Sequence, residues 1–166
     1  MSGRADLMRG ADDLLLEHQL CFALAVASRS VIASYRPVLE PLGLTHPQYL
    51  VMLALWERSP RTVRDVSDAL LLEPATMTPL LKRLEEAGLV TRTRQPGNER
   101  ALDVTLTQAG RALREKALAV PVTMMARLGI SRGDAEELHR SMMKLVDAAQ
   151  ASREADAAET ARTSVG

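Results

Sequence analysis

The most restrictive feature of this sequence is a change of hydrophobic period at about residue 89. Before it, apolar residues recur at helical spacing, as at Met77, Leu81 and Leu84. After it, "ALDVTLT" alternates strictly between apolar and polar residues, which is typical of a strand with one buried face. The Pro-Gly-Asn turn in "QPGNER" joins that strand to "LVTRTR", so this region is predicted to form a β-hairpin. Two short strands are not stable alone in water, so the hairpin must pack on helices.

Four helical segments precede the hairpin. The first is expected to be a long, mostly apolar helix from about Asp13 to Leu39 that Pro37 kinks or ends. The second, "THPQYLVMLALWERS", begins with a capping box of Thr45 and Gln48. Two shorter helices follow, "PRTVRDVSDALL" and "EPATMTPLLKRLEEAG", joined by a tight turn. A helix as apolar as the first usually needs burial against a large partner, such as another helix.

Two further helices are expected after the hairpin. Thr107 caps one that runs towards Gly129, and Asp134 with Glu137 caps a last one that reaches Gln150. The order of elements predicts a mainly α fold with a small β-hairpin wing. It is a winged helix-turn-helix with six helices, a unit that binds DNA.

The fourth helix of this unit would enter the major groove of DNA. The residues expected to contact DNA are Ala75, Thr76, Thr78, Pro79, Lys82 and Arg83 on that helix, and Arg92, Arg94 and Arg100 on the hairpin. Arg100 lies near the hairpin tip, where an arginine can enter a narrow minor groove. Bulk charge gives no such indication, because 21 Lys and Arg balance 21 Asp and Glu. The DNA-binding interpretation therefore rests on the order of elements and on these local cations.

Cysteine usage and hydropathy favour a cytoplasmic protein. The chain has one cysteine, Cys21, which excludes an intrachain disulfide and is typical of a reducing compartment. The N-terminal "MSGRADLMRGADD" has no long apolar run, so no secretory signal is expected. No apolar stretch approaches the roughly 20 residues that span a bilayer, so no membrane partner is expected.

The sequence resembles the MarR family of dimeric winged-helix regulators. The resemblance is carried by "LLKRLEEAGLVTRTR" and "NERALDVTLTQAGR". Within the family, "LCFAL", "YRPVLEPLGLT", "PQYLVMLALWE" and "MTPLLKRLE" are most similar to the organic-hydroperoxide sensors (OhrR-like repressors), ungapped from about Glu17 to Arg114. The resemblance implies an obligate homodimer, joined by its N- and C-terminal helices, that binds a palindromic DNA operator and is released by oxidation.

The resemblance also divides the chain into regions. We expect a dimerisation and sensor helix at 13–44, a winged helix-turn-helix at 45–110 and C-terminal dimerisation helices at 111–155. We expect residues 1–12 and 156–166 to be flexible; the C-terminal tail is made of small and polar residues.

By the same resemblance, Cys21 is the peroxide sensor and Tyr35 is one of its supporting tyrosines. Two further tyrosines of the subgroup are replaced here by Ala25 and His46, and an acidic residue of the wing tip is replaced by Asn98. His46 could take the place of a missing tyrosine as a hydrogen-bond donor and would add positive charge if protonated. His18, three residues before Cys21, would lie on the same helix face and is a second candidate to stabilise the thiolate.

The spacing of Cys21 and Tyr35 separates them within one chain. Fourteen residues of continuous helix correspond to about 21 Å along the axis, and they return to nearly the same face. The two side chains can meet if two such helices pack antiparallel across a dimer interface. Because the chain has no second cysteine, a sulfenic acid at Cys21 must end as a mixed disulfide with a small thiol, a sulfenamide or an over-oxidised acid.

Three alternatives stay open at this point. A MarR-type repressor could instead be controlled by an aromatic or drug-like ligand at the same interface pocket. His18, Cys21 and His46 could form a metal cluster, although no carboxylate completes a recognisable ligand spacing, so neither metal nor cofactor is expected. A thiol peroxidase is a third class, but no resolving thiol, catalytic triad or phosphate loop supports an enzyme.

Overall fold

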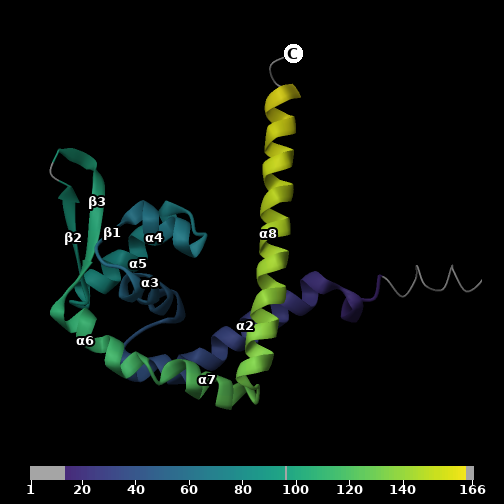
Figure 1. The fold of residues 1–166 in the computed structure, drawn as a ribbon, viewed down its shortest axis with the longest axis horizontal. Coiled ribbons are helices and arrows are strands. Elements are labelled where there is room, and N and C mark those ends of the chain that lie inside the picture. Colours follow the sequence, from purple (N-terminus) through teal and green to yellow (C-terminus); the bar gives the residue numbers. More distant parts are fainter. Residues whose placement is uncertain (1–13, 96, 164–166) are drawn as a thin grey trace, which may run out of the picture. The chain divides into compact units, whose positions relative to one another are not determined.

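The computed structural model describes residues 14–95 and 97–163, so the segment 1–12 and the last three residues of the expected flexible tail lie outside the described residues. The chain divides after Met124 into two compact units. The described elements are shown in Figure 1. In chain order they are η1 (Leu16–His18), α2 (Leu20–Leu39), η2 (Glu40–Leu42), α3 (His46–Glu57), β1 (Arg61–Thr62), α4 (Val63–Leu70), α5 (Pro74–Glu86), β2 (Val90–Gln95), β3 (Asn98–Leu106), α6 (Gln108–Ala117), α7 (Val120–Leu128) and α8 (Arg132–Thr163).

The predicted mainly α fold with a winged helix-turn-helix is confirmed. Helices α4 and α5 are the two short helices, and the β2–β3 hairpin follows α5 directly. The sheet has a third strand that the sequence did not suggest, the two-residue β1, and its strand order is β1-β3-β2. All neighbouring strands are antiparallel, with Arg61 opposite Val104 and Val90 opposite Leu106. Val104 and Leu106 are buried, as the alternation predicted.

Helix α2 begins later than predicted. It starts at Leu20, not Asp13, because the backbone of Gln19 is extended (φ −81°, ψ 117°) and separates α2 from the single turn η1. Pro37 does not end the helix, which continues to Leu39. Because proline removes an N–H from the ladder but lies near the C-terminal end, the loss is confined to the last turn.

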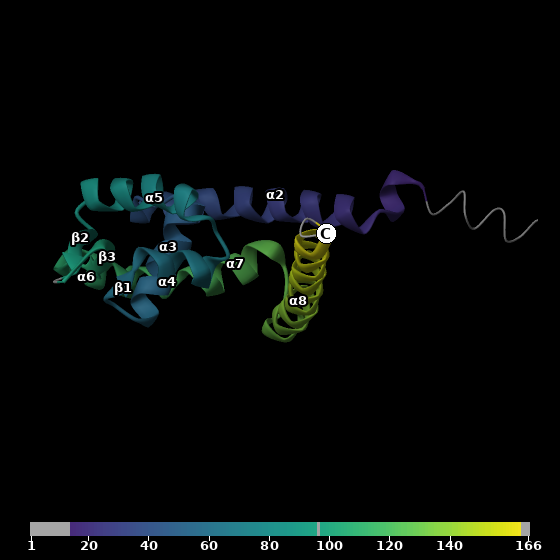
Figure 2. The ribbon, with the colours of Figure 1, turned by 90° about the horizontal axis from the view of Figure 1, so that it is seen from above.

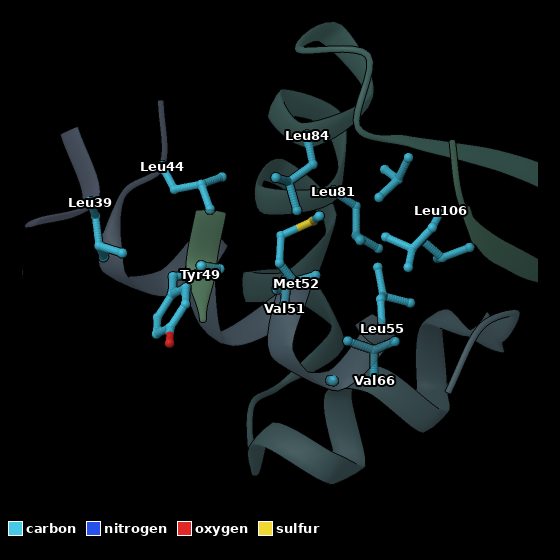
Figure 3. Close-up of a cluster of buried hydrophobic side chains, with 14 of the residues drawn as sticks. Leu39, Leu44, Tyr49, Val51, Met52, Leu55, Val66, Leu81, Leu84 and Leu106 are labelled. Carbon is cyan, nitrogen blue, oxygen red and sulfur yellow. The ribbon is translucent and has the colours of Figure 1, made fainter. Parts of the chain in front are cut away.

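Helix α3 lies at the centre of the core. Its buried side chains include Tyr49, Val51, Met52 and Leu55. These pack against apolar residues of α4, α5 and the sheet, as Figure 3 shows for Val66, Leu81, Leu84 and Leu106. The predicted capping box at the start of α3 is present, with the Thr45 N–H donating to Gln48 Oε1 at 2.8 Å.

The base of the wing is tied to α3 and α5 through a few backbone atoms. The Thr107 hydroxyl caps α6 by accepting from the Gly110 N–H (3.0 Å) and donates to Gly88 O (2.7 Å). The Trp56 indole N–H donates to Gly110 O at 2.8 Å. Gly110 is buried against Leu89, and a Cβ at residue 110 would overlap the Leu89 carbonyl. Only glycine fits there.

The single helix expected from Thr107 to Gly129 is two helices, α6 and α7. The break falls after Ala117, since Pro121 near the start of α7 has no N–H to donate to the Ala117 carbonyl. In the second unit, α8 is capped by Ser131 and not by Asp134. The Ser131 hydroxyl accepts a hydrogen bond from the Asp134 N–H (3.1 Å), and Asp134 Oδ2 in turn accepts one from the Ser131 N–H (3.0 Å).

Helix α8 continues past the predicted end at Gln150 to Thr163, so residues 156–163 of the tail expected to be flexible are helical. The extra turns are rich in Ala, Glu and Arg, which are strong helix formers, and no Gly or Pro interrupts them. Among the described residues, no helix is both long and apolar enough to span a membrane.

Gly110→Ala is expected to lower the free energy of unfolding by about 1–3 kcal/mol, because the new methyl group overlaps the Leu89 backbone. Urea or thermal denaturation followed by circular dichroism measures the change. Gly133→Ala is the matched control, since its Cβ would lie 3.8 Å from Ser131 Oγ, an ordinary contact. Equal stability of the two variants would contradict the tight packing at Gly110.

Candidate DNA-binding surface and thiol site

Helix α5 buries one face and exposes the other. Met77, Leu81 and Leu84 are fully buried against the core. The six residues predicted to contact DNA are all exposed: Ala75, Thr76, Thr78, Pro79, Lys82 and Arg83. Figure 2 shows α5 at the edge of the winged region, with α3 on its inner side. The helical period of the sequence therefore places these six residues together on one accessible surface.

The polar groups on this face differ in what they can offer to a ligand. The Thr78 hydroxyl donates to the Pro74 carbonyl at 3.2 Å, so its outward lone pairs act as acceptors. Lys82 lies 3.9 Å from the Glu86 carboxylate, with both side chains mostly exposed. An exposed pair of this kind is weak, so Lys82 stays available to another anion.

Arg92 does not project from the wing as the sequence suggested. Its Nε and Nη2 donate to Glu85 Oε2 at 3.0 and 2.6 Å, and its backbone N–H donates to Glu85 Oε1 at 3.1 Å. These bonds from Arg92 hold the pKa of Glu85 below its usual range. The pair joins β2 to α5, and its side chains are 24% and 36% exposed. Arg92 therefore fixes the wing against the helix, a role that sequence reasoning missed.

Of the other two wing arginines, the structure describes the side chain of Arg94 but not that of Arg100. Arg94 is exposed on β2, where a phosphate could reach it. Arg100 belongs to β3, but its side chain, like that of Asn98, lies outside the described residues. Among the described side chains, the exposed cations on α5 and the wing are thus Lys82, Arg83 and Arg94.

Cys21 is exposed at the second position of α2. Its neighbours Leu20 and Phe22 are 60% and 38% exposed, and Ala25, one turn later, is also exposed. Figure 2 shows the N-terminal half of α2 extending beyond helices α3, α4 and α5. His18 lies in η1, and the extended backbone at Gln19 separates it from α2, so the predicted shared helix face with Cys21 is wrong.

Tyr35 lies near the other end of α2, in a cluster of rings. Its ring centroid is 5.0 Å from that of His46, in an edge arrangement, and 6.1 Å from that of Tyr49. Burial lowers the pKa of His46, so the imidazole is neutral at pH 7 and acts as a hydrogen-bonding group, not as a cation. The pKa of Tyr49 is raised by burial and by Tyr35, which keeps its phenol protonated.

The structure brings Tyr35 and His46 together but leaves Cys21 apart from them. The continuous helix between Cys21 and Tyr35 covers about 21 Å. No group of three His, Cys, Asp or Glu side chains suited to a metal ion occurs in the part of the chain that the structure describes.

A groove of about 570 Å³ adjoins the Tyr35–His46 pair. It lies between α2, η2 and the start of α3, and most of its wall is apolar. Arg36, Glu40 and His46 are the titratable residues in its lining. Sequence reasoning did not identify it, because its walls come from segments that meet only through the turn after Leu39. A groove of this size and lining is suited to a small organic ligand.

Comparison with known proteins agrees with the winged helix-turn-helix fold of the structure. Residues 44–102 match the model of the MarR family. An organic hydroperoxide resistance transcriptional regulator of Bacillus subtilis is 43% identical over 127 residues, which are 76% of this chain and 84% of that protein.

Two solved proteins are similar in fold. AbfR of Staphylococcus epidermidis, in its reduced form bound to DNA and in its overoxidized form bound to DNA, has a TM-score of 0.64 and 34% identity over 86% of this chain and 98% of that chain. The repressor CouR bound to a 23-mer DNA duplex has a TM-score of 0.70 and 27% identity, covering 81% and 96%. CouR from Rhodococcus jostii RHA1 was also solved with p-coumaroyl-CoA, with a TM-score of 0.69 and 26% identity over 80% of this chain and 94% of that chain.

These relatives are transcriptional regulators, and three of the solved structures, two of AbfR and one of CouR, carry DNA on the same fold. The family match spans α3, α4, α5 and most of the wing, which are the elements that form the exposed surface described above. The chain belongs to the MarR family and is a DNA-binding transcriptional regulator.

Proposed function

We propose that this regulator is a repressor that binds a palindromic DNA operator as a homodimer and is released when an organic hydroperoxide oxidises Cys21. One observation carries the proposal: an exposed thiol and its expected partner, Tyr35, lie at opposite ends of α2. A second copy packed antiparallel would bring Cys21 of one chain to Tyr35 and His46 of the other. The sensor would then be complete only in the dimer.

Exposed apolar side chains around the thiol support a dimer interface there. Leu14, Leu15, Leu16, Leu20 and Phe22 are all exposed within nine residues of sequence. A contiguous set of this kind usually marks a contact with another chain. We keep 13–44 and 111–155 as the proposed dimerisation regions on either side of the winged region at 45–110.

We assign distinct roles to the residues of the DNA-binding surface. Ala75, Pro79 and the methyl groups of Thr76 and Thr78 are suited to thymine methyl groups, and the Thr78 hydroxyl to a base amino group as acceptor. Lys82, Arg83 and Arg94 would contact phosphates, and Arg100 the minor groove. Arg92 would position the wing through Glu85.

The proposed chemistry is a two-electron oxidation of sulfur. The Cys21 thiolate attacks the terminal oxygen of the hydroperoxide, an S–O bond forms, the O–O bond breaks, and the alkoxide leaves as an alcohol after taking a proton. A low-molecular-weight thiol then displaces hydroxide from the sulfenic acid, giving a mixed disulfide and water. The phenol of Tyr35 in the second copy would donate a hydrogen bond to the thiolate.

Two relatives support an organic hydroperoxide as the signal and the mixed disulfide as the form that releases DNA. The Bacillus subtilis regulator is named for organic hydroperoxide resistance. AbfR was captured on DNA in both reduced and overoxidized forms, so we assign release to the bulky mixed disulfide and not to over-oxidation alone. We further propose that the protein acts in the cytoplasm and is oxidised stoichiometrically, without catalytic turnover.

The groove beside His46 favours a second candidate function, control by a small aromatic ligand. Its apolar walls and the Arg36 guanidinium are suited to an aromatic carboxylate. CouR, solved with p-coumaroyl-CoA, supports the same alternative. A thermal-shift titration with aromatic carboxylates separates the two functions, because a ligand of the native state raises the melting temperature with the logarithm of its concentration.

Cys21→Ser is expected to bind DNA as tightly as the reduced wild-type protein, and its DNA affinity should not change when hydroperoxide is added. The probe is a duplex enriched from random sequence by the reduced protein, and binding is followed by fluorescence anisotropy with cumene hydroperoxide and free cysteine present. Wild-type affinity should fall at least about tenfold, and that of the variant less than about twofold. A variant that releases DNA as wild type does would refute the sensor role.

Glu85→Gln and Arg92→Gln are each expected to weaken binding of the same duplex by about three- to tenfold, and the double variant no further, because both break one contact. If Arg92 instead contacts DNA directly, Glu85→Gln should strengthen binding of the duplex, because loss of the carboxylate would free Arg92. It also predicts that Arg92→Gln lowers the salt slope of binding by about one. Binding measured against salt concentration decides between the two roles.

A further inference from the structure

The junction between α5 and β2 is held by a compact set of hydrogen bonds, which we call the wing junction and which consists of Gly88, Leu89, Thr107 and Gly110. The Thr107 hydroxyl donates to Gly88 O, the Thr107 N–H donates to Leu89 O at 3.1 Å, and the Gly110 N–H donates to the Thr107 hydroxyl. Gly88 and Leu89 are two of the three residues (87–89) between α5 and β2, so their position sets how the wing leaves the helix.

The wing junction is tightly packed at Gly110. Gly110 is buried with its Cα against the Leu89 carbonyl, where not even a methyl group fits. The Trp56 indole N–H donates to Gly110 O at 2.8 Å from α3. Because protein interiors are close-packed, a shift of the Trp56 ring would move Gly110 and hence Leu89.

On its other side, Trp56 belongs to a series of rings that reaches α2. The ring centroids of Trp56 and Tyr49 are 6.3 Å apart, and those of Tyr49 and Tyr35 are 6.1 Å apart. Tyr49 is buried, and its ring lies between those of Tyr35 and Trp56. Two ring contacts and one hydrogen bond therefore connect Tyr35 on α2 to the wing junction, along α3 to the start of α6.

We propose that Trp56 is the positioning residue that couples the state of Tyr35 to the wing junction. The inference rests on the proposed function, in which oxidised Cys21 of the second copy presses on Tyr35. Displacement of Tyr35 shifts Tyr49 and Trp56, and the indole N–H carries the shift to Gly110 O. The wing and α5 then change their relative placement, and DNA binding weakens. Trp56 contacts neither DNA nor the thiol in this scheme.

The wild-type protein tests the coupling directly, since Trp56 is the only tryptophan in the chain. Addition of cumene hydroperoxide and free cysteine should change the emission of Trp56 with the same time course as DNA release. The emission of Cys21→Ser should not change. Release of DNA with unchanged Trp56 emission would overturn the proposal, and this measurement requires no variant of Trp56.

Trp56→Phe tests whether the indole N–H is the link. The ring contact with Tyr49 is retained and the bond to Gly110 O is lost, so the reduced variant should bind DNA within about threefold of wild type. The ratio of reduced to oxidised affinity should fall from about tenfold or more to below about threefold. Val66→Ala, which removes buried methyl groups from α4 away from these rings, is the stability control and should keep the wild-type ratio.

Mass spectrometry of Cys21 separates the two possible failures. If Cys21 of Trp56→Phe is oxidised at the wild-type rate and DNA is still released in full, the coupling through Trp56 is refuted and the sensor role stands. If wild-type Cys21 is not oxidised, or is oxidised without release of DNA, the proposed function fails and this inference fails with it.

Discussion

Helix α3 is apolar on almost every side, and the arrangement of the winged region follows from the need to cover it. Its buried residues are contacted by α4, α5 and the sheet, and its ends carry Tyr49 and Trp56 towards two different partners. A helix that is apolar on most of its sides leaves few ways to arrange the elements that cover it. The same helix therefore fixes α5 with its polar face outward and places the Tyr35 cluster in contact with the core.

The two candidate sites obey different physical constraints. The proposed DNA-binding surface lies within one chain, because a single helix and its adjoining hairpin supply the residues that we assign to it. The proposed thiol site would be incomplete in one chain, because a straight helix keeps Cys21 and Tyr35 about 21 Å apart. A regulator built this way has a physical reason to dimerise: the second copy would supply the missing half of the sensor.

Local signals in the sequence predicted most of the elements. The capping box at Thr45 and the alternation that buries Val104 are properties of a few adjacent residues, and both are present. The start of α2 was misplaced because the extended backbone at Gln19 interrupts an apolar pattern that shows no break. The cap of α8 was misplaced because Ser131 caps the helix three residues earlier than expected. The start of a helix and its capping residue depend on backbone conformation, which the spacing of apolar residues does not encode.

Local sequence patterns were sufficient to predict the winged helix-turn-helix, the exposed face of α5 and the separation of Cys21 from Tyr35, because the period and rise of an α-helix hardly vary between proteins. Three features could not be predicted from such patterns: Glu85 holds Arg92, burial keeps His46 neutral, and Trp56 reaches Gly110. Each of these depends on contacts or burial created by packing one element on another. The residues of the longest such contact, Trp56 and Gly110, are 54 positions apart.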